Sequence, residues 1–108
     1  MSINKSKKTI EREQLKKWRL LVLERDNSVD QITGEKLIGR NCQVHHVLDK
    51  KNFPHLKFDI NNGLTLSYRN HKVGKLSPHM NALLFAKFFM NNFPDRYKYL
   101  MKRINIVH

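Results

Sequence analysis

The chain has 108 residues, of which 40% are apolar, so it is long enough for one compact domain and too short for two. Its 21 Lys and Arg outnumber nine Asp and Glu, and the formal charge of +12 narrows its partners to polyanions: DNA, RNA or an anionic membrane surface. Cys42 is the only cysteine, which excludes an internal disulfide. No apolar run of about 20 residues is found, which excludes a membrane span, and no signal peptide is found, so a soluble, cytoplasmic protein is predicted.

A first helix is predicted over residues 10–25, after a basic and flexible arm at residues 1–8. Apolar side chains, among them Leu15 and Trp18, recur there at helical spacing, and Thr9 is expected to cap the helix. The opposite face is basic and carries Lys16, Lys17 and Arg19. These charges are either a solvated face or contacts to DNA phosphates.

Two short strands are predicted in the middle of the chain. Residues 43–48 have the length and the β-branched side chains of a strand, and residues 63–66 form the second. Residues 49–62 between them are polar, contain a proline and are predicted to form a loop. A short helix over residues 68–75 is expected to end near Gly74.

Two helices are predicted near the C-terminus. Ser77 and Pro78 are typical of a helix start, and the helix that follows is expected to run to about Asn92. It is apolar nearly all round, which predicts burial on two sides. Pro94 should end it, and a last helix is expected over residues 95–104. Together these elements predict an α+β fold.

Four polar residues in and after the strands suit the hydrolysis of a phosphodiester bond. Histidine is a common general base and metal ligand, and successive strand residues point to opposite faces, so His45 and His46 should have different tasks. His71 lies on another element and can complete a metal site opposite His45. Asn62 offers a donor and an acceptor with which to hold a loop or orient a ring.

Five segments within residues 15–75 resemble, in order and spacing, the motifs of phage-type HNH endonucleases. They correspond to the helix before the site, a Cys-x-x-Cys-Gly turn, the catalytic strand, the long loop with the second strand, and a Cys-x-x-Cys-His segment. In this chain they read WRLLVLERDN at 18–27, VDQITG at 29–34, VHHV at 44–47, FPHLKFDINNGLTL at 53–66 and SYRNHK at 67–72.

The resemblance implies a ββα-metal finger, in which two antiparallel strands and a helix surround one divalent ion: Mg, Mn, Ni or Zn. Position by position, His45 and His71 would be metal ligands and His46 the general base. Asn62 would either orient the loop beside His46 or bind the metal, since the family uses this residue in both ways.

One domain over residues 9–108 is then expected, with its core motif at 43–75 and helical support at 77–104. Three basic residues near His71 would be either contacts to the DNA backbone or exposed charges: Arg69, Lys72 and Lys75. His79 is expected at most to contact DNA or a phosphate.

The chain departs from the family pattern at the four cysteines that bind zinc in many relatives. Their places hold Asp30, Thr33, Ser67 and Asn70. Thr, Ser and Asn are poor zinc ligands, so no structural zinc is expected. The apolar helix at residues 78–91 is expected to supply the stability that the bound zinc gives those relatives. Cys42 is expected to be an isolated thiol.

The function implied by the resemblance is metal-dependent cleavage of DNA, in a protein that phages encode. A monomer would nick one strand and a homodimer could cut both. The alternative is a DNA-binding or regulatory module on the same fold that does not cleave.

Overall fold

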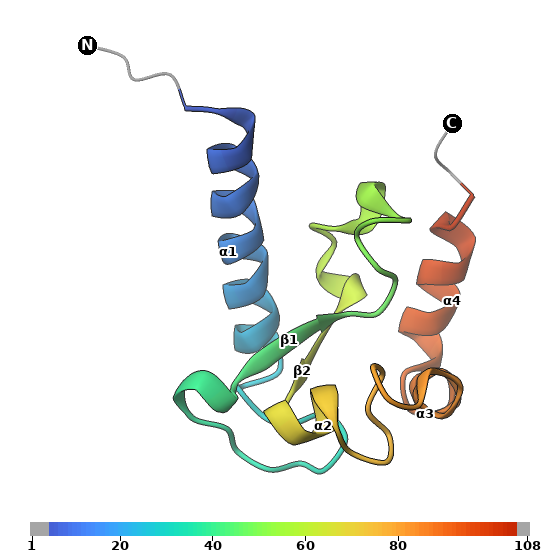
Figure 1. Ribbon diagram of the computed structural model, residues 1–108. Coiled ribbons are helices and arrows are strands. Elements are labelled where there is room, and N and C mark those ends of the chain that lie inside the picture. The colour runs from blue at the N-terminus through green and yellow to red at the C-terminus, as the bar shows by residue number, and fades with distance from the viewer. Residues whose placement is uncertain (1–4, 106–108) are drawn as a thin grey trace.

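Two short antiparallel strands, β1 (Gln43–His46) and β2 (Gly63–Leu66), form the centre of the fold, with Gln43 paired to Leu66 and His46 to Gly63. The computed structural model describes residues 5–105. In that part of the chain four helices surround the hairpin: α1 (Lys7–Arg25), α2 (Tyr68–Lys72), α3 (Ala82–Asn92) and α4 (Pro94–Arg103) (Figure 1). The predicted α+β class is confirmed.

Helix α1 packs on the hairpin through one apolar stripe. Trp18 and Val22 are buried there, and a Cβ on Gly63 of β2 would lie only 2.5 Å from Val22 and 2.7 Å from Trp18. A glycine at that position therefore lets the helix approach the strand closely.

The start of α1 differs from the prediction. Ser6, not Thr9, is the cap: its Oγ accepts a hydrogen bond from the backbone N–H of Thr9 at 3.1 Å. The helix therefore begins at Lys7, inside the stretch that we expected to be a flexible arm, of which residues 1–4 lie outside the described chain.

Two predicted elements are shorter in the structure. Strand β1 ends at His46 instead of residue 48, because the backbone N–H and C=O of Leu48 both bond to the side chain of Asn62. Helix α2 ends at Lys72 instead of residue 75, where the N–H of Gly74 turns back to the carbonyl of Arg69.

Helix α3 begins later and is more exposed than predicted. Residues 77–80 form a turn closed by the Ser77 hydroxyl, and the helix starts at Ala82. Its inner face joins the core, which consists of Leu56, Leu64, Leu66, Phe85, Phe89 and Leu100. The expected burial on two sides is wrong, since Leu83 is 84% exposed. No helix within residues 5–105 is long and apolar enough to cross a membrane.

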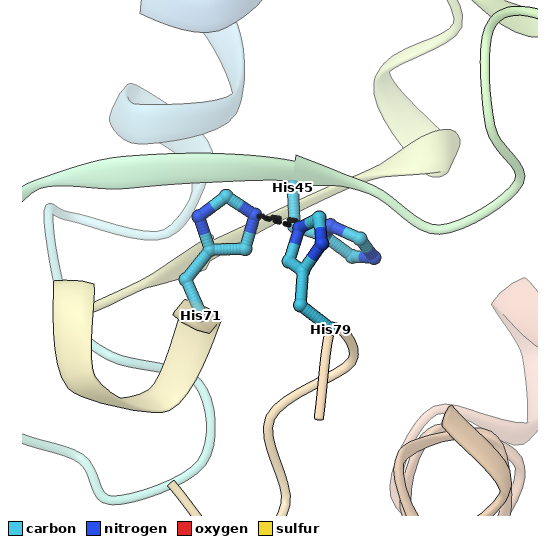
Figure 2. A group of neighbouring side chains, drawn as sticks. All are labelled: His45, His71 and His79. Atoms are coloured by element: carbon cyan, nitrogen blue, oxygen red, sulfur yellow. Dashed lines mark hydrogen bonds between the residues drawn. The ribbon is translucent and has the colours of Figure 1, made fainter. Parts of the chain in front are cut away.

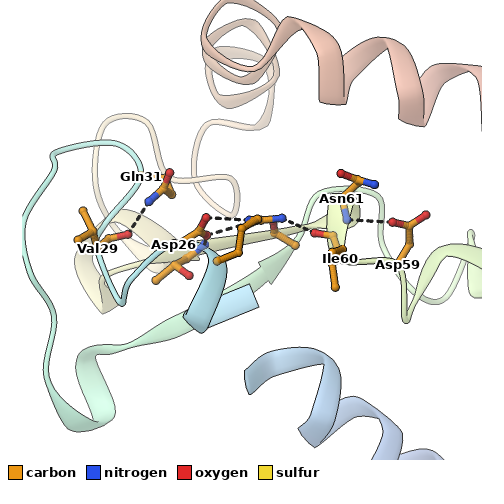
Figure 3. A network of polar contacts seen from close by, with 9 residues as sticks. Asp26, Val29, Gln31, Asp59, Ile60 and Asn61 are labelled. Atoms are coloured by element: carbon orange, nitrogen blue, oxygen red, sulfur yellow. Dashed lines mark hydrogen bonds and ion pairs between the residues drawn. The ribbon is translucent and has the colours of Figure 1, made fainter. Parts of the chain in front are cut away.

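The end of α1 is tied to β2 by charged side chains. Arg25 donates to both carboxylate oxygens of Asp26 and to the carbonyls of Ile60 and Gly63. Asp26 in turn accepts from the backbone N–H of Thr65 at 3.0 Å. Figure 3 shows this network running from Asp26 towards Ile60. This network fixes the orientation of α1 relative to β2.

A second buried carboxylate connects the two turns on either side of the hairpin. Asp30 is completely buried; its Oδ1 accepts from the N–H groups of Ile32 and Thr33, and its Oδ2 accepts from Ser67 N–H and the Asn70 amide. One side chain therefore holds together the 30–33 and 67–70 turns, and the second of these leads into α2.

Candidate functional site

The two adjacent histidines of β1 lie on opposite faces of the hairpin, as strand geometry requires. His46 stacks on Trp18 of α1, with ring centroids 4.0 Å apart and planes within 9°. His45 points the other way, and its ring meets Phe85 of α3 edge-on at 5.4 Å. The strand thus delivers the two rings to different environments on its two faces.

Three histidines converge on the His45 side. Figure 2 shows His45 from β1, His71 from α2 and His79 from the turn before α3 directed towards one another. His45 Nδ1 lies 3.2 Å from His71 Nε2, and His79 Nε2 lies 3.0 Å from the same atom. One ring nitrogen from each residue falls within 4.8 Å of the other two.

The surroundings keep these rings neutral. Burial, together with His71 and His79, lowers the pKa of His45 to about 3. Burial and Lys72 lower the pKa of His71 to about 4, and the pKa of His79 is lowered for the same two reasons. Neutral imidazoles at pH 7 have a lone pair to offer a cation.

These three histidines could hold a divalent metal ion. Two ligand nitrogens of a tetrahedral zinc site lie roughly 3.4 Å apart, given Zn–N bonds of about 2.1 Å. The spacings of 3.2 and 3.0 Å around His71 Nε2 are close to this value. His71 Nδ1 donates to Gln43 Oε1 at 2.7 Å, which leaves Nε2 as the coordinating atom, a support common for metal-bound histidines.

His46 is held in one tautomer. Its Nε2 lies 2.9 Å from the carbonyl of Lys57, which can only accept, so Nε2 carries the proton and Nδ1 keeps its lone pair. Burial lowers the pKa of His46 more than the bond to Lys57 raises it, and Lys50 lowers it further. A neutral imidazole with a free Nδ1 is equipped to accept a proton from water.

Asn62 acts on the loop between the strands. Its side chain is fully buried; Oδ1 accepts from Leu48 N–H at 2.7 Å, and Nδ2 donates to the carbonyls of Leu48 and Leu56. Of the two roles that the sequence left open, this geometry matches the loop-orienting one, since both ends of the amide are engaged away from the three-histidine cluster.

All six basic residues that were predicted to contact DNA are at the surface, and one of them, Arg19, also bonds within the protein. The exposed ones are Lys16, Lys17, Arg69, Lys72 and Lys75. Arg19 is exposed as well, but its guanidinium donates to the carbonyl of Cys42 at 2.8 Å, a bond that links α1 to the start of β1. Lys75 follows α2 rather than belonging to it.

His79 is the site residue that sequence reasoning missed. Its position depends on Ser77, whose buried hydroxyl donates to the carbonyl of His71 at 2.7 Å and accepts from the N–H of His79 at 3.2 Å. The available signal was a histidine immediately after a Ser-Pro turn, eight residues beyond His71. By contrast, His55 lies apart, its Nε2 bonded to the carbonyl of Arg103.

Comparison with known proteins adds no relative: no family model matches the chain, and no curated protein or solved structure does. The fold and the site by themselves define a small, basic α+β protein. On one face of its central hairpin lies a cluster of three neutral histidines, and on the other face lies a single oriented histidine.

Proposed function

We propose that the protein is a metal-dependent DNA endonuclease of the HNH type, in which β1, β2 and α2 form a ββα-metal finger. The observation that carries the proposal is the pairing of two sites on adjacent residues. His45 belongs to a cluster suited to a metal, and His46, the next residue of β1, presents a neutral Nδ1 on the other face of the hairpin. Hydrolysis of a phosphodiester needs both a cation and a general base.

The residues divide the work as follows. Nδ1 of His46 takes a proton from the attacking water, while the Lys57 carbonyl keeps the opposite nitrogen protonated. Trp18 restricts the tilt of the His46 ring. Asn62 holds the loop that supplies the Lys57 carbonyl by bonding to Leu48 at its start and to Leu56 directly before Lys57.

His45, His71 and His79 would hold the cation. When bound, a divalent ion supplies positive charge that stabilises the negative charge developing on the scissile phosphate and the leaving oxygen. Three imidazole nitrogens favour zinc or nickel over magnesium and manganese, which prefer oxygen ligands. The net charge of +12 supports a polyanionic substrate, with affinity that falls as salt rises.

Nicking of supercoiled plasmid tests the proposal. Purified protein is incubated with EDTA or with added magnesium, manganese, nickel or zinc, beside His46→Ala and the control His55→Ala, which removes a histidine outside the site. We expect nicking that requires a metal, is lost in His46→Ala by at least about a hundredfold, and survives in His55→Ala.

Salt-sensitive DNA binding without cleavage under any metal would instead favour a non-cleaving DNA-binding module on the same fold. In that case His46→Ala would leave every measured property of the protein unchanged.

A further inference from the structure

An open cavity of about 510 Å³ adjoins the candidate site, between the end of β1 and helices α3 and α4. His45, His46 and His79 form part of its lining. The remainder of the wall is mostly apolar and aromatic, and includes Phe85, Phe89, Tyr97 and Leu100. The mechanism proposed above makes no use of this space.

Small residues on α3 leave the cavity open. Ala82 and Ala86 both line it, at exposed positions of the helix, while Phe85 between them is buried. A cavity of this volume falls within the range of roughly 300–1,000 Å³ that is usual for small-molecule sites.

We infer that this cavity receives a nucleobase of a nucleotide next to the scissile phosphate, and that the preferred substrate is DNA with an unpaired nucleotide at that point. The inference rests on the proposed function, because the phosphate that reaches His45 and His79 determines which chemical group lies at the cavity mouth. The covalent neighbours of that phosphate are a sugar and its base.

The chemistry of the wall selects the base over the sugar. Tyr97 is half-buried and offers part of an aromatic face, while the buried Phe85 and Phe89 add only narrow apolar surface to the wall. An apolar wall complements the face of a base and leaves phosphate and sugar oxygens without partners. Asp49 is the acidic residue of the lining and it is exposed. With so few polar groups to contact base edges, the cavity should accept all four bases with little discrimination.

The base must be unpaired to enter. A paired base is stacked inside the duplex and must be unpaired and unstacked before it can enter, whereas a bulged or single-stranded base is already available. The substrate class is therefore a bulge, flap or single strand in preference to uninterrupted duplex.

Filling the cavity tests this. Ala86→Leu places a larger side chain in it and keeps a good helix former at an exposed position. Asn91→Leu introduces the same exposed leucine on the same helix, at a residue that does not line the cavity. Binding is measured by fluorescence anisotropy in the presence of zinc, with two labelled 30-base-pair DNAs that differ only in a one-nucleotide bulge. All proteins carry His46→Asn, which removes the general base but keeps a polar side chain in the cavity lining, so that no DNA is cut during the measurement.

We expect the bulged DNA to bind about tenfold more tightly than the paired DNA, a preference that Ala86→Leu removes and Asn91→Leu keeps. Equal affinity for both DNAs, or a preference that survives Ala86→Leu, would overturn the inference. So would a change of oligomeric state in Ala86→Leu, because a second copy would then be the occupant.

The two proposals fail separately. Plasmid nicking by the wild type without a bulge preference would overturn the cavity's role and leave the nuclease standing. A bulge preference that is lost in Ala86→Leu, in a protein that never cuts DNA, would support the cavity's role and overturn the nuclease.

Discussion

Asp30 shows how much one buried carboxylate can organise. Its two oxygens accept from four nitrogen donors, and these donors belong to the two turns where the HNH resemblance would place zinc-binding cysteines. The sequence led us to expect packing of the apolar helix as the replacement for zinc. Phe85 and Phe89 of α3 do pack into the core, but the direct link between the turns is made by Asp30.

Replacing this residue should destabilise the fold in a pH-dependent way. Burial alone would raise the pKa of Asp30, but hydrogen bonds, chiefly from Ser67, lower it overall. The ionised form therefore stabilises the protein fully above the ordinary pKa of about 3.9, and this contribution is lost as the pH falls through the lower folded-state pKa. We expect Asp30→Asn to reduce the free energy of unfolding by about 3 kcal/mol at pH 7.

Urea unfolding at pH 7 and at pH 3 provides the measurement. The gap between wild type and Asp30→Asn should narrow at pH 3, while Asp95→Asn, at an exposed carboxylate in the first turn of α4, should change little at either pH. A variant as stable as the wild type at pH 7 would show that the carboxylate does not link the turns energetically.

At the level of elements, α1 reaches the candidate site through one side chain. The Trp18 ring lies flat against His46, and its Nε1 donates to the carbonyl of Asp59 at 2.7 Å. Asp59 follows closely on Lys57, whose carbonyl bonds to the other edge of the His46 ring. The helix therefore positions both the histidine and the loop segment that selects its tautomer.

Removing the stack should slow cleavage without weakening DNA binding. We expect Trp18→Leu to lower the nicking rate by about tenfold to a hundredfold, because small errors in the placement of a general base are costly. Trp18→Phe should retain most of the rate. The imidazole ¹⁵N shifts of His46 should report a single Nε2–H tautomer in the wild type and a mixture in Trp18→Leu.

Val22→Ala is the matched control for this helix. It removes buried contact with β2 and costs about 1–3 kcal/mol of stability, yet Val22 is a full turn from Trp18. If Val22→Ala slowed nicking as much as Trp18→Leu does, general loosening of α1 would be the cause rather than the stack.

Over the whole molecule, the hairpin separates α1 from the histidine cluster and from α2 and α3 (Figure 1). Positive charge is found on both sides. Lys72 lies close enough to His45, His71 and His79 to lower the pKa of each of them. A phosphate held at the cluster would meet this lysine first.

The location of a charge, and not only the total, should therefore determine DNA affinity. Lys72→Gln and Lys98→Gln each remove one exposed lysine and leave the same net charge. We expect Lys72→Gln to weaken DNA binding and to reduce the slope of log K against log salt by about 1, and Lys98→Gln, on α4, to change both much less. Identical effects of the two variants would mean that DNA binds without reference to the cluster.

Local physics made much of this protein predictable from its sequence. Periodic apolar residues indicated α1, and proline at residue 94 marked the end of α3 at Asn92. The alternation of a strand was enough to assign His45 and His46 to different faces. The errors at the ends of elements came from side chains that compete for backbone groups, such as Ser6 at α1 and Asn62 at β1.

Only the tertiary structure decided what depends on residues far apart in the chain. His79 joins His45 and His71 because the Ser77 turn folds back on α2, a contact that spacing along the chain does not encode. The bonds of Asn62 likewise depend on the fold, which brings the N–H of Leu48 to its Oδ1 and the carbonyl of Leu56 to its Nδ2. From the sequence, Asp30 was only the residue at the place of a zinc-binding cysteine, and its link between the two turns depends on four donors that the fold brings around it. A hydrogen-bond network is defined by positions in space, and the sequence lists only its members.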